Sequence, residues 1–163
     1  MTYPNGASIR DLAEWGRTYV ASRPPDREVG RTDGKPGMLR WYVVPRNNFG
    51  NVYLHKFVGS DSYPHDHPFD NVSLILDGYY LEHLVDGISI TRFTGDRIAR
   101  PRQEIHRIEL VAGPCLSLFV TGPTVLDAKG EPLWGFLLSD GWKPWRSVIR
   151  ADAAGNTDYE RDP

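Results

Sequence analysis

The stretch "SYPHDHPFDNVSLILDG", residues 62–78, places two histidines one residue apart and leads directly into an alternating apolar segment. Side chains two positions apart on an extended chain lie on the same face, so His65 and His67 can direct both imidazoles at one point while Asp66 turns away. Neutral imidazoles are good ligands for iron, zinc, nickel or copper, but a stable site needs a third ligand. The stretch therefore predicts one half of a metal site on a β-rich scaffold.

The composition of the 163-residue chain favours one soluble, β-rich domain. The chain is 40% hydrophobic and 25% charged, and its 16 Gly, 13 Pro, 8 Tyr and 5 Trp favour many turns and short strands. A formal net charge of −2, without a run of Lys and Arg, argues against nucleic acid as a partner. No signal sequence and no run of about 18 apolar residues is present, so we expect a cytoplasmic protein that does not enter a membrane.

The order of patterns along the chain predicts a helix followed by a barrel of short strands. Residues 8–22 read as an amphipathic helix that packs outside a sheet, with Ser8 as its cap. Residues 27–38, rich in glycine and charge, predict a loop. From about residue 38 to 150 the alternation predicts about eight to ten strands in a jelly-roll-like sandwich. Residues 151–163 predict a polar tail, which leaves residues 1–150 as a single domain.

The residues around the two histidines keep a fixed spacing. Five residues separate Gly59 from His65, three residues separate His67 from Asn71, and six residues separate Asn71 from Gly78. This pattern resembles the first motif of the cupin superfamily, in which a glutamate stands at the place that Asn71 occupies here.

A second motif follows at "GDRIARPRQEIHRIEL", residues 95–110. Gly95, Pro101 and His106 stand at the offsets of the second cupin motif, whereas Gln103 replaces its glycine and Leu110 replaces its asparagine. The two motifs together resemble those of cupins over roughly residues 50–122. The resemblance implies an all-β fold, a cupin-type jelly-roll β-barrel, here with an N-terminal helix. His106 would be the third metal ligand beside His65 and His67.

The replacement of the motif's glutamate by Asn71 shapes the predicted chemistry. Three neutral histidines leave a divalent ion with a charge near +2, which favours an anionic, bidentate organic substrate. This ligand pattern is similar to that of three-histidine dioxygenases such as cysteine dioxygenase, which implies Fe(II) as the cofactor and dioxygen as a co-substrate. Asn71 or Asp70 remains open as a fourth ligand.

Two other classes of function remain open at this point. One is an isomerase, lyase or hydrolase that uses Zn, Ni or Mn as a Lewis acid. The other is a non-catalytic cupin that only binds a small molecule.

Further side chains are candidates for the surroundings of the metal. In the cysteine dioxygenase branch an arginine of an early strand holds the substrate carboxylate, and Arg40 stands in a comparable place. Arg102 competes for that role, as do Arg46 and Arg100. The candidates for proton transfer are His55, Tyr63 and His83. The candidates for substrate contact are Arg40, Tyr53, Asn71 and Arg102.

The aromatic segment "PLWGFLLSDGWKPWRSV", residues 132–148, allows three interpretations: a lid, a dimer contact or a small satellite core. A homodimer is expected because cupins often pair through strands. The single cysteine, Cys115, lies in an apolar alternating run, which predicts a buried structural thiol.

Overall fold

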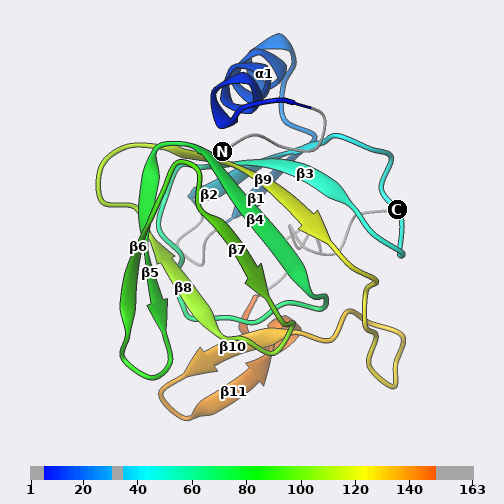
Figure 1. The fold of residues 1–163 in the computed structure, drawn as a ribbon. Coiled ribbons are helices and arrows are strands. Elements are labelled where there is room, and N and C mark those ends of the chain that lie inside the picture. Colours follow the sequence, from blue (N-terminus) through cyan, green and yellow to red (C-terminus); the bar gives the residue numbers. More distant parts are fainter. Residues whose placement is uncertain (1–5, 31–34, 150–163) are drawn as a thin grey trace.

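The computed structural model describes residues 6–30 and 35–149, in which antiparallel strands form the body of the molecule and one long helix covers an outer face (Figure 1). The all-β fold class is therefore confirmed. The polar tail predicted for residues 151–163 lies outside the described residues. No helix in the described ranges is long and apolar enough to cross a membrane.

The larger sheet has six strands in the order β1-β2-β3-β9-β4-β7. Each strand pairs with its neighbours in antiparallel fashion. The bounds are β1 Arg27–Gly30, β2 Pro36–Tyr42, β3 Val52–Phe57, β4 Asn71–Asp77, β7 Arg97–Arg100 and β9 Cys115–Thr121. The prediction of a loop over residues 27–38 is wrong, because β1 and the start of β2 lie there and pair with each other.

The smaller sheet has three strands in the order β6-β5-β8, with β5 Tyr79–Leu84, β6 Ser89–Phe93 and β8 His106–Glu109. The chain passes from β4 into β5 through Gly78, where φ is +80° and a Cβ would lie 2.8 Å from the carbonyl oxygen of Pro114. Glycine is favoured at this corner because side chains strain a positive φ. A hairpin of β10 (Gly135–Leu138) and β11 (Gly141–Pro144), followed by α2 (Trp145–Val148), lies at the end of the molecule away from the helix (Figure 1).

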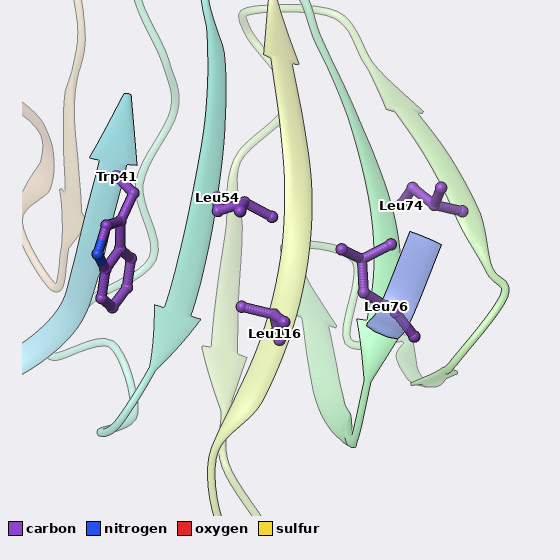
Figure 2. Packing of buried hydrophobic residues seen from close by; sticks show 6 residues of the cluster. Trp41, Leu54, Leu74, Leu76 and Leu116 are labelled. Atoms are coloured by element: carbon purple, nitrogen blue, oxygen red, sulfur yellow. The ribbon is translucent and has the colours of Figure 1, made fainter. Parts of the chain in front are cut away.

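The long helix, α1 (Ile9–Ser22), packs outside the six-stranded sheet, as the sequence predicts. Ser8 caps it in a reciprocal capping box with Asp11. Its apolar stripe packs on outward-facing side chains of the sheet, and together they form one hydrophobic cluster. Figure 2 shows the side chains of this cluster that come from neighbouring strands, gathered on one face of the sheet. The buried members of this cluster are Ala13, Trp41, Leu54, Leu74, Leu76 and Leu116.

The opposite, inward face of the same strands is apolar at one end and polar at the other. At the apolar end Cys115 packs with Ile75, Tyr80, Ile98 and Ile108. Burial raises the pKa of the Cys115 thiol to about 12, so the prediction of a buried structural thiol is confirmed. The polar end holds the histidines and their partners.

Candidate metal centre

Three histidines meet where the segment between β3 and β4 runs beside the first residue of β8. His65 and His106 form an antiparallel bridge, in which each backbone N–H donates to the other residue's carbonyl, at 2.9 and 3.0 Å. One potential ligand atom from each of His65, His67 and His106 lies within 4.8 Å of the other two. In residues 6–30 and 35–149 no other group of three His, Cys, Asp or Glu residues is placed in this way. The cluster joins the three residues that the two motifs predict as ligands.

His106 is oriented by a buried carboxylate. Its Nδ1 lies 2.8 Å from Oε1 of Glu82, so Nδ1 carries the proton and donates it in this hydrogen bond. Burial lowers the pKa of His106 to about 4, although the bond to Glu82 acts in the opposite direction. The ring is therefore neutral near pH 7, and its buried Nε2 has no hydrogen-bond partner. An unpartnered imidazole lone pair of this kind fits a metal ion.

Glu82 is itself fully buried and paired with two arginines. Nε of Arg92 and Nε of Arg100 each lie 2.7 Å from a carboxylate oxygen of Glu82. Burial alone would raise the pKa of Glu82, but the hydrogen bond from His106 and the charge of Arg100 outweigh it and lower the pKa to about 2. Arg100 also donates to the hydroxyl of Tyr80, at 3.3 Å. The carboxylate is thus ionised, and its charge is balanced before any metal binds.

Glu82 is not among the site residues predicted from the sequence, although its strand carries a signal for it. In β5, Glu82 alternates in phase with buried Tyr80, so it falls on the inward face. A carboxylate on the buried face of a strand requires a charged partner. Arg100, in phase with buried Ile98 on β7, supplies one.

His65 and His67 differ in their surroundings. Nδ1 of His65 donates to the carbonyl oxygen of Tyr63 at 3.3 Å and lies 3.9 Å from a carboxylate oxygen of Asp61. Burial lowers the pKa of His67 well below its ordinary value, and its buried Nδ1 has no hydrogen-bond partner. The backbone N–H of His67 donates to the carbonyl of Arg102 at 3.1 Å, which holds the segment in place.

The residues present fit a divalent transition metal. Two buried imidazole nitrogens lack partners, on His67 and on His106, and such atoms are rare in folded proteins unless a ligand or water satisfies them. Three neutral imidazoles suit iron, zinc, nickel or copper. The centre can therefore hold a divalent metal ion.

The two candidates for a fourth ligand are placed differently. Asp70 is exposed, and its carboxylate accepts the backbone N–H of Arg102 at 2.8 Å, so it serves a turn and is not grouped with the histidines. Asn71 is 4% exposed and lies on the inward face of β4, and neither atom of its amide has a hydrogen-bond partner. Asn71 is thus available to a metal or to its ligand.

Arg40, Tyr53 and His55 come together on the inward side of β2 and β3. Nε of Arg40 donates to Nε2 of His55 at 2.9 Å, and the guanidinium carbon lies 4.6 Å from the centre of the Tyr53 ring. Burial and the charge of Arg40 lower the pKa of His55 well below its ordinary value. The ring of Phe119 contacts both His55 and His67, with centroid distances of 4.7 and 6.0 Å. Phe119 therefore lies between His55 and His67, one of the three clustered histidines.

Of the remaining predicted site residues, His83 lies away from the cluster, whereas Tyr63 and Arg102 lie next to it in the fold. His83 points away from Glu82 on β5, and its ring nitrogens contact Ser89 Oγ and Glu109 Oε2, each at 2.8 Å, so it is not grouped with the other histidines. Tyr63 is 39% exposed beside His65. Arg102 meets the site through its backbone contact to His67.

The aromatic segment near the C-terminus forms a satellite core, one of the three interpretations of its sequence. Trp134, Phe136 and Trp145 are buried together. Two of these rings also contact His65, with centroid distances of 6.3 Å for Trp134 and 6.1 Å for Phe136. The satellite core thus forms one wall of the histidine cluster.

Comparisons with known proteins bear on the fold. No family model matches the chain, and no curated protein matches it significantly. Among solved structures, an uncharacterised conserved protein with a double-stranded β-helix domain from Klebsiella pneumoniae is similar over 74% of this chain and 92% of its own, with 18% identity and a TM-score of 0.50. At this identity the likeness concerns the fold alone.

Two further structures give lower TM-scores. The DMSP lyase DddQ from Ruegeria pomeroyi matches 60% of this chain with 15% identity and a TM-score of 0.48, and this chain spans only 51% of its length. KdgF from Halomonas sp. matches 55% of this chain and 82% of its own, with 21% identity and a TM-score of 0.47.

Proposed function

We propose that this chain, which has the double-stranded β-helix fold of the cupins as its two motifs predict, is a metal-dependent enzyme. Its most fitting activity is that of an Fe(II) dioxygenase acting on a small anionic, bidentate organic substrate. The observation that carries this proposal is the group of His65, His67 and His106, within 4.8 Å of one another and without a carboxylate among them.

The charge of the centre supports an anionic substrate. Three neutral imidazoles leave the charge of a divalent ion uncompensated. The negative charge of Glu82 does not compensate it, because Glu82 is already paired with Arg92 and Arg100. A thiolate, enolate or carboxylate that binds through two atoms would neutralise the ion. Iron(II), when bound, would supply the redox chemistry and the open coordination positions.

The chain's own residues would bind and orient the substrate. The unpartnered amide of Asn71 can both donate and accept a hydrogen bond at a bound ligand. Arg40 and His55 form a hydrogen-bonded pair, and the ring of Phe119 stacks on that of His55. The positive charge of Arg40 would stabilise an anionic substrate from this side. Tyr63, beside His65 and partly exposed, is the candidate for proton transfer.

The same donor set also fits a second function. Three histidines with an open position are a ligand set of catalytic zinc, which polarises a substrate without redox chemistry. An isomerase, lyase or hydrolase with Zn, Ni or Mn is therefore the alternative.

Metal analysis followed by an oxygen-uptake assay tests the proposal. The purified protein is loaded with iron(II) without air and then offered thiols, diketones and phenolic acids in the presence of oxygen. We expect one metal ion per chain and substrate-dependent oxygen uptake. His67→Ala should abolish both, whereas His83→Ala, a histidine outside the cluster, should preserve both.

The other outcomes are equally informative. Stable metal binding without oxygen uptake, but with conversion of a substrate by the zinc form, would replace the dioxygenase with the alternative. Absence of stoichiometric metal, or a His67→Ala variant that binds metal as well as the wild type does, would contradict the metal centre.

A further inference from the structure

We infer that the C-terminal hairpin, β10 and β11, is a structural part of the metal centre and that Asp66 is the positioning residue that joins them. The inference rests on the metal-binding part of the proposed function and applies to whichever reaction the centre performs. Asp66 stands between two of the three proposed ligands in the sequence, and the hairpin begins almost 70 residues later.

The carboxylate of Asp66 contacts both strands of the hairpin. One oxygen accepts the backbone N–H of Gly135 on β10, at 2.6 Å, and the other accepts Nε1 of Trp142 on β11, at 3.1 Å. The backbone N–H of Asp66 returns a hydrogen bond to the carbonyl of Gly135, at 3.1 Å. Three hydrogen bonds from one residue thus attach the metal-binding segment to the hairpin.

The backbone around Asp66 continues the same attachment. Leu137 donates to the carbonyl of Pro64 at 2.9 Å, and His65 forms an antiparallel bridge with Phe136. On its other side His65 forms the bridge with His106. The main chain of His65 is therefore held from two sides, by β8 and by β10, and a shift of the hairpin would shift a ligand.

Gly135 makes this arrangement possible. A Cβ at this position would lie 2.0 Å from the carbonyl oxygen of Lys143 and 2.7 Å from the indole ring of Trp142. The absence of a side chain lets the indole cross β10 closely and reach Asp66. The two partners of Asp66 are thus brought together at one glycine.

This geometry has a measurable consequence for metal affinity. Residues that orient metal ligands without touching the metal typically change affinity by about 10- to 100-fold when they are replaced. Because coupling between two equilibria is reciprocal, a bound metal should stabilise hairpin docking by the same factor. Trp134, Trp142 and Trp145 lie in this region, so tryptophan fluorescence reports on it.

Cobalt(II) titration of Asp66→Asn and Asp66→Ala, in competition with a chromophoric chelator, tests the inference. We expect about 10- to 100-fold weaker binding and an altered visible absorption spectrum of the bound cobalt, with an unchanged far-UV circular dichroism spectrum. Trp142→Phe, which removes one of the three hydrogen bonds, should act in the same direction but less.

Asp127→Asn is the matched control. Its carboxylate also accepts two backbone N–H groups, from Lys129 and Glu131 at 2.7 and 3.0 Å, but it has no contact with the histidine cluster among the described interactions. This variant should bind cobalt as the wild type does, with the same spectrum.

The outcomes separate the inference from the proposed function. If the wild type binds cobalt and both Asp66 variants bind it equally well with the wild-type spectrum, the hairpin is not part of the centre, whereas the metal centre itself stands. If the wild type binds no cobalt, the metal centre and this inference both fail. Should the Asp66 variants not fold, Trp142→Phe decides, and an affinity and spectrum equal to the wild type's would overturn the inference.

Discussion

At the scale of single residues, Asn71 determines the charge of the proposed centre. It stands where the cupin motif has a glutamate, and its buried amide has no partner in the protein. Replacing an amide by a carboxylate at this place would add a strong ligand and reduce the net charge of the metal site by one.

Asn71→Glu should therefore tighten the binding of cobalt(II) by about tenfold or more and weaken the binding of an anionic probe such as azide to the cobalt form. Chelator competition and the visible spectrum of cobalt measure the two effects. Asn71→Leu, which has no donor atom, should leave cobalt affinity near that of the wild type. Equal cobalt affinity in Asn71→Glu and the wild type would mean that this side chain does not reach the metal.

The sequence predicts the three clustered histidines but not the residues that support them. His65, His67 and His106 could be found because two motifs fix their spacing. Glu82 could have been found from its phase in β5. The role of Asp66 could not be predicted from the sequence. Alternation predicts only that its side chain points away from His65 and His67, and its partners on the hairpin are distant in the sequence.

At the scale of elements, α1 depends on a close approach to the sheet. Gly16 faces the strands, and a Cβ there would lie 2.8 Å from Cδ1 of Leu76 and 3.2 Å from Cδ2 of Leu116. Both leucines are buried in the cluster beneath the helix, so they have little room to move.

Gly16→Val should destabilise the protein by about 1–3 kcal/mol through overpacking, which urea unfolding followed by circular dichroism measures. Glu14→Val, an exposed position of the same helix, serves as the control and should change stability much less. A Gly16→Val variant as stable as the wild type would show that α1 can move away from the sheet at no cost.

Elements with a strong local sequence signal were predicted better than short elements without one. The cap at Ser8 and the apolar stripe define α1 within one residue of its observed start. By contrast, β1 is a four-residue strand at the edge of a sheet, and its sequence, Arg-Glu-Val-Gly, has no strong β preference. Its conformation comes from pairing with β2, a contact that local pattern does not reveal.

At the scale of the whole molecule, the buried titratable groups link folding to pH. The pKa of His106 is about 4, below its ordinary 6.5, and that of Glu82 is about 2, below its ordinary 4.5. In each case the unfolded chain binds the proton at a higher pH than the folded protein does. The free energy of unfolding therefore decreases as pH falls from the ordinary pKa of each group to its pKa in the folded protein.

The metal-free protein should thus lose stability from about pH 6.5 to 4 through His106, and again from about 4.5 to 2 through Glu82. Urea midpoints measured at a series of pH values test this. Glu82→Gln should be less stable at pH 7, because Arg100 loses its buried counter-charge, and should lose less stability below pH 4.5. A midpoint that stays constant between pH 7 and 4 would contradict the neutral state assigned to the buried histidines.

The homodimer and the cytoplasmic location, both expected from the sequence, remain predictions.

The backbone bridge between His65 and His106 bears on how the protein would acquire its metal. Two of the three proposed ligands are fixed relative to each other by the main chain, so this part of the site is already formed before any metal ion binds. The identity of the resident metal would follow the supply of ions in the cell and the affinity order of the imidazoles, and would not be set at the moment when the chain folds.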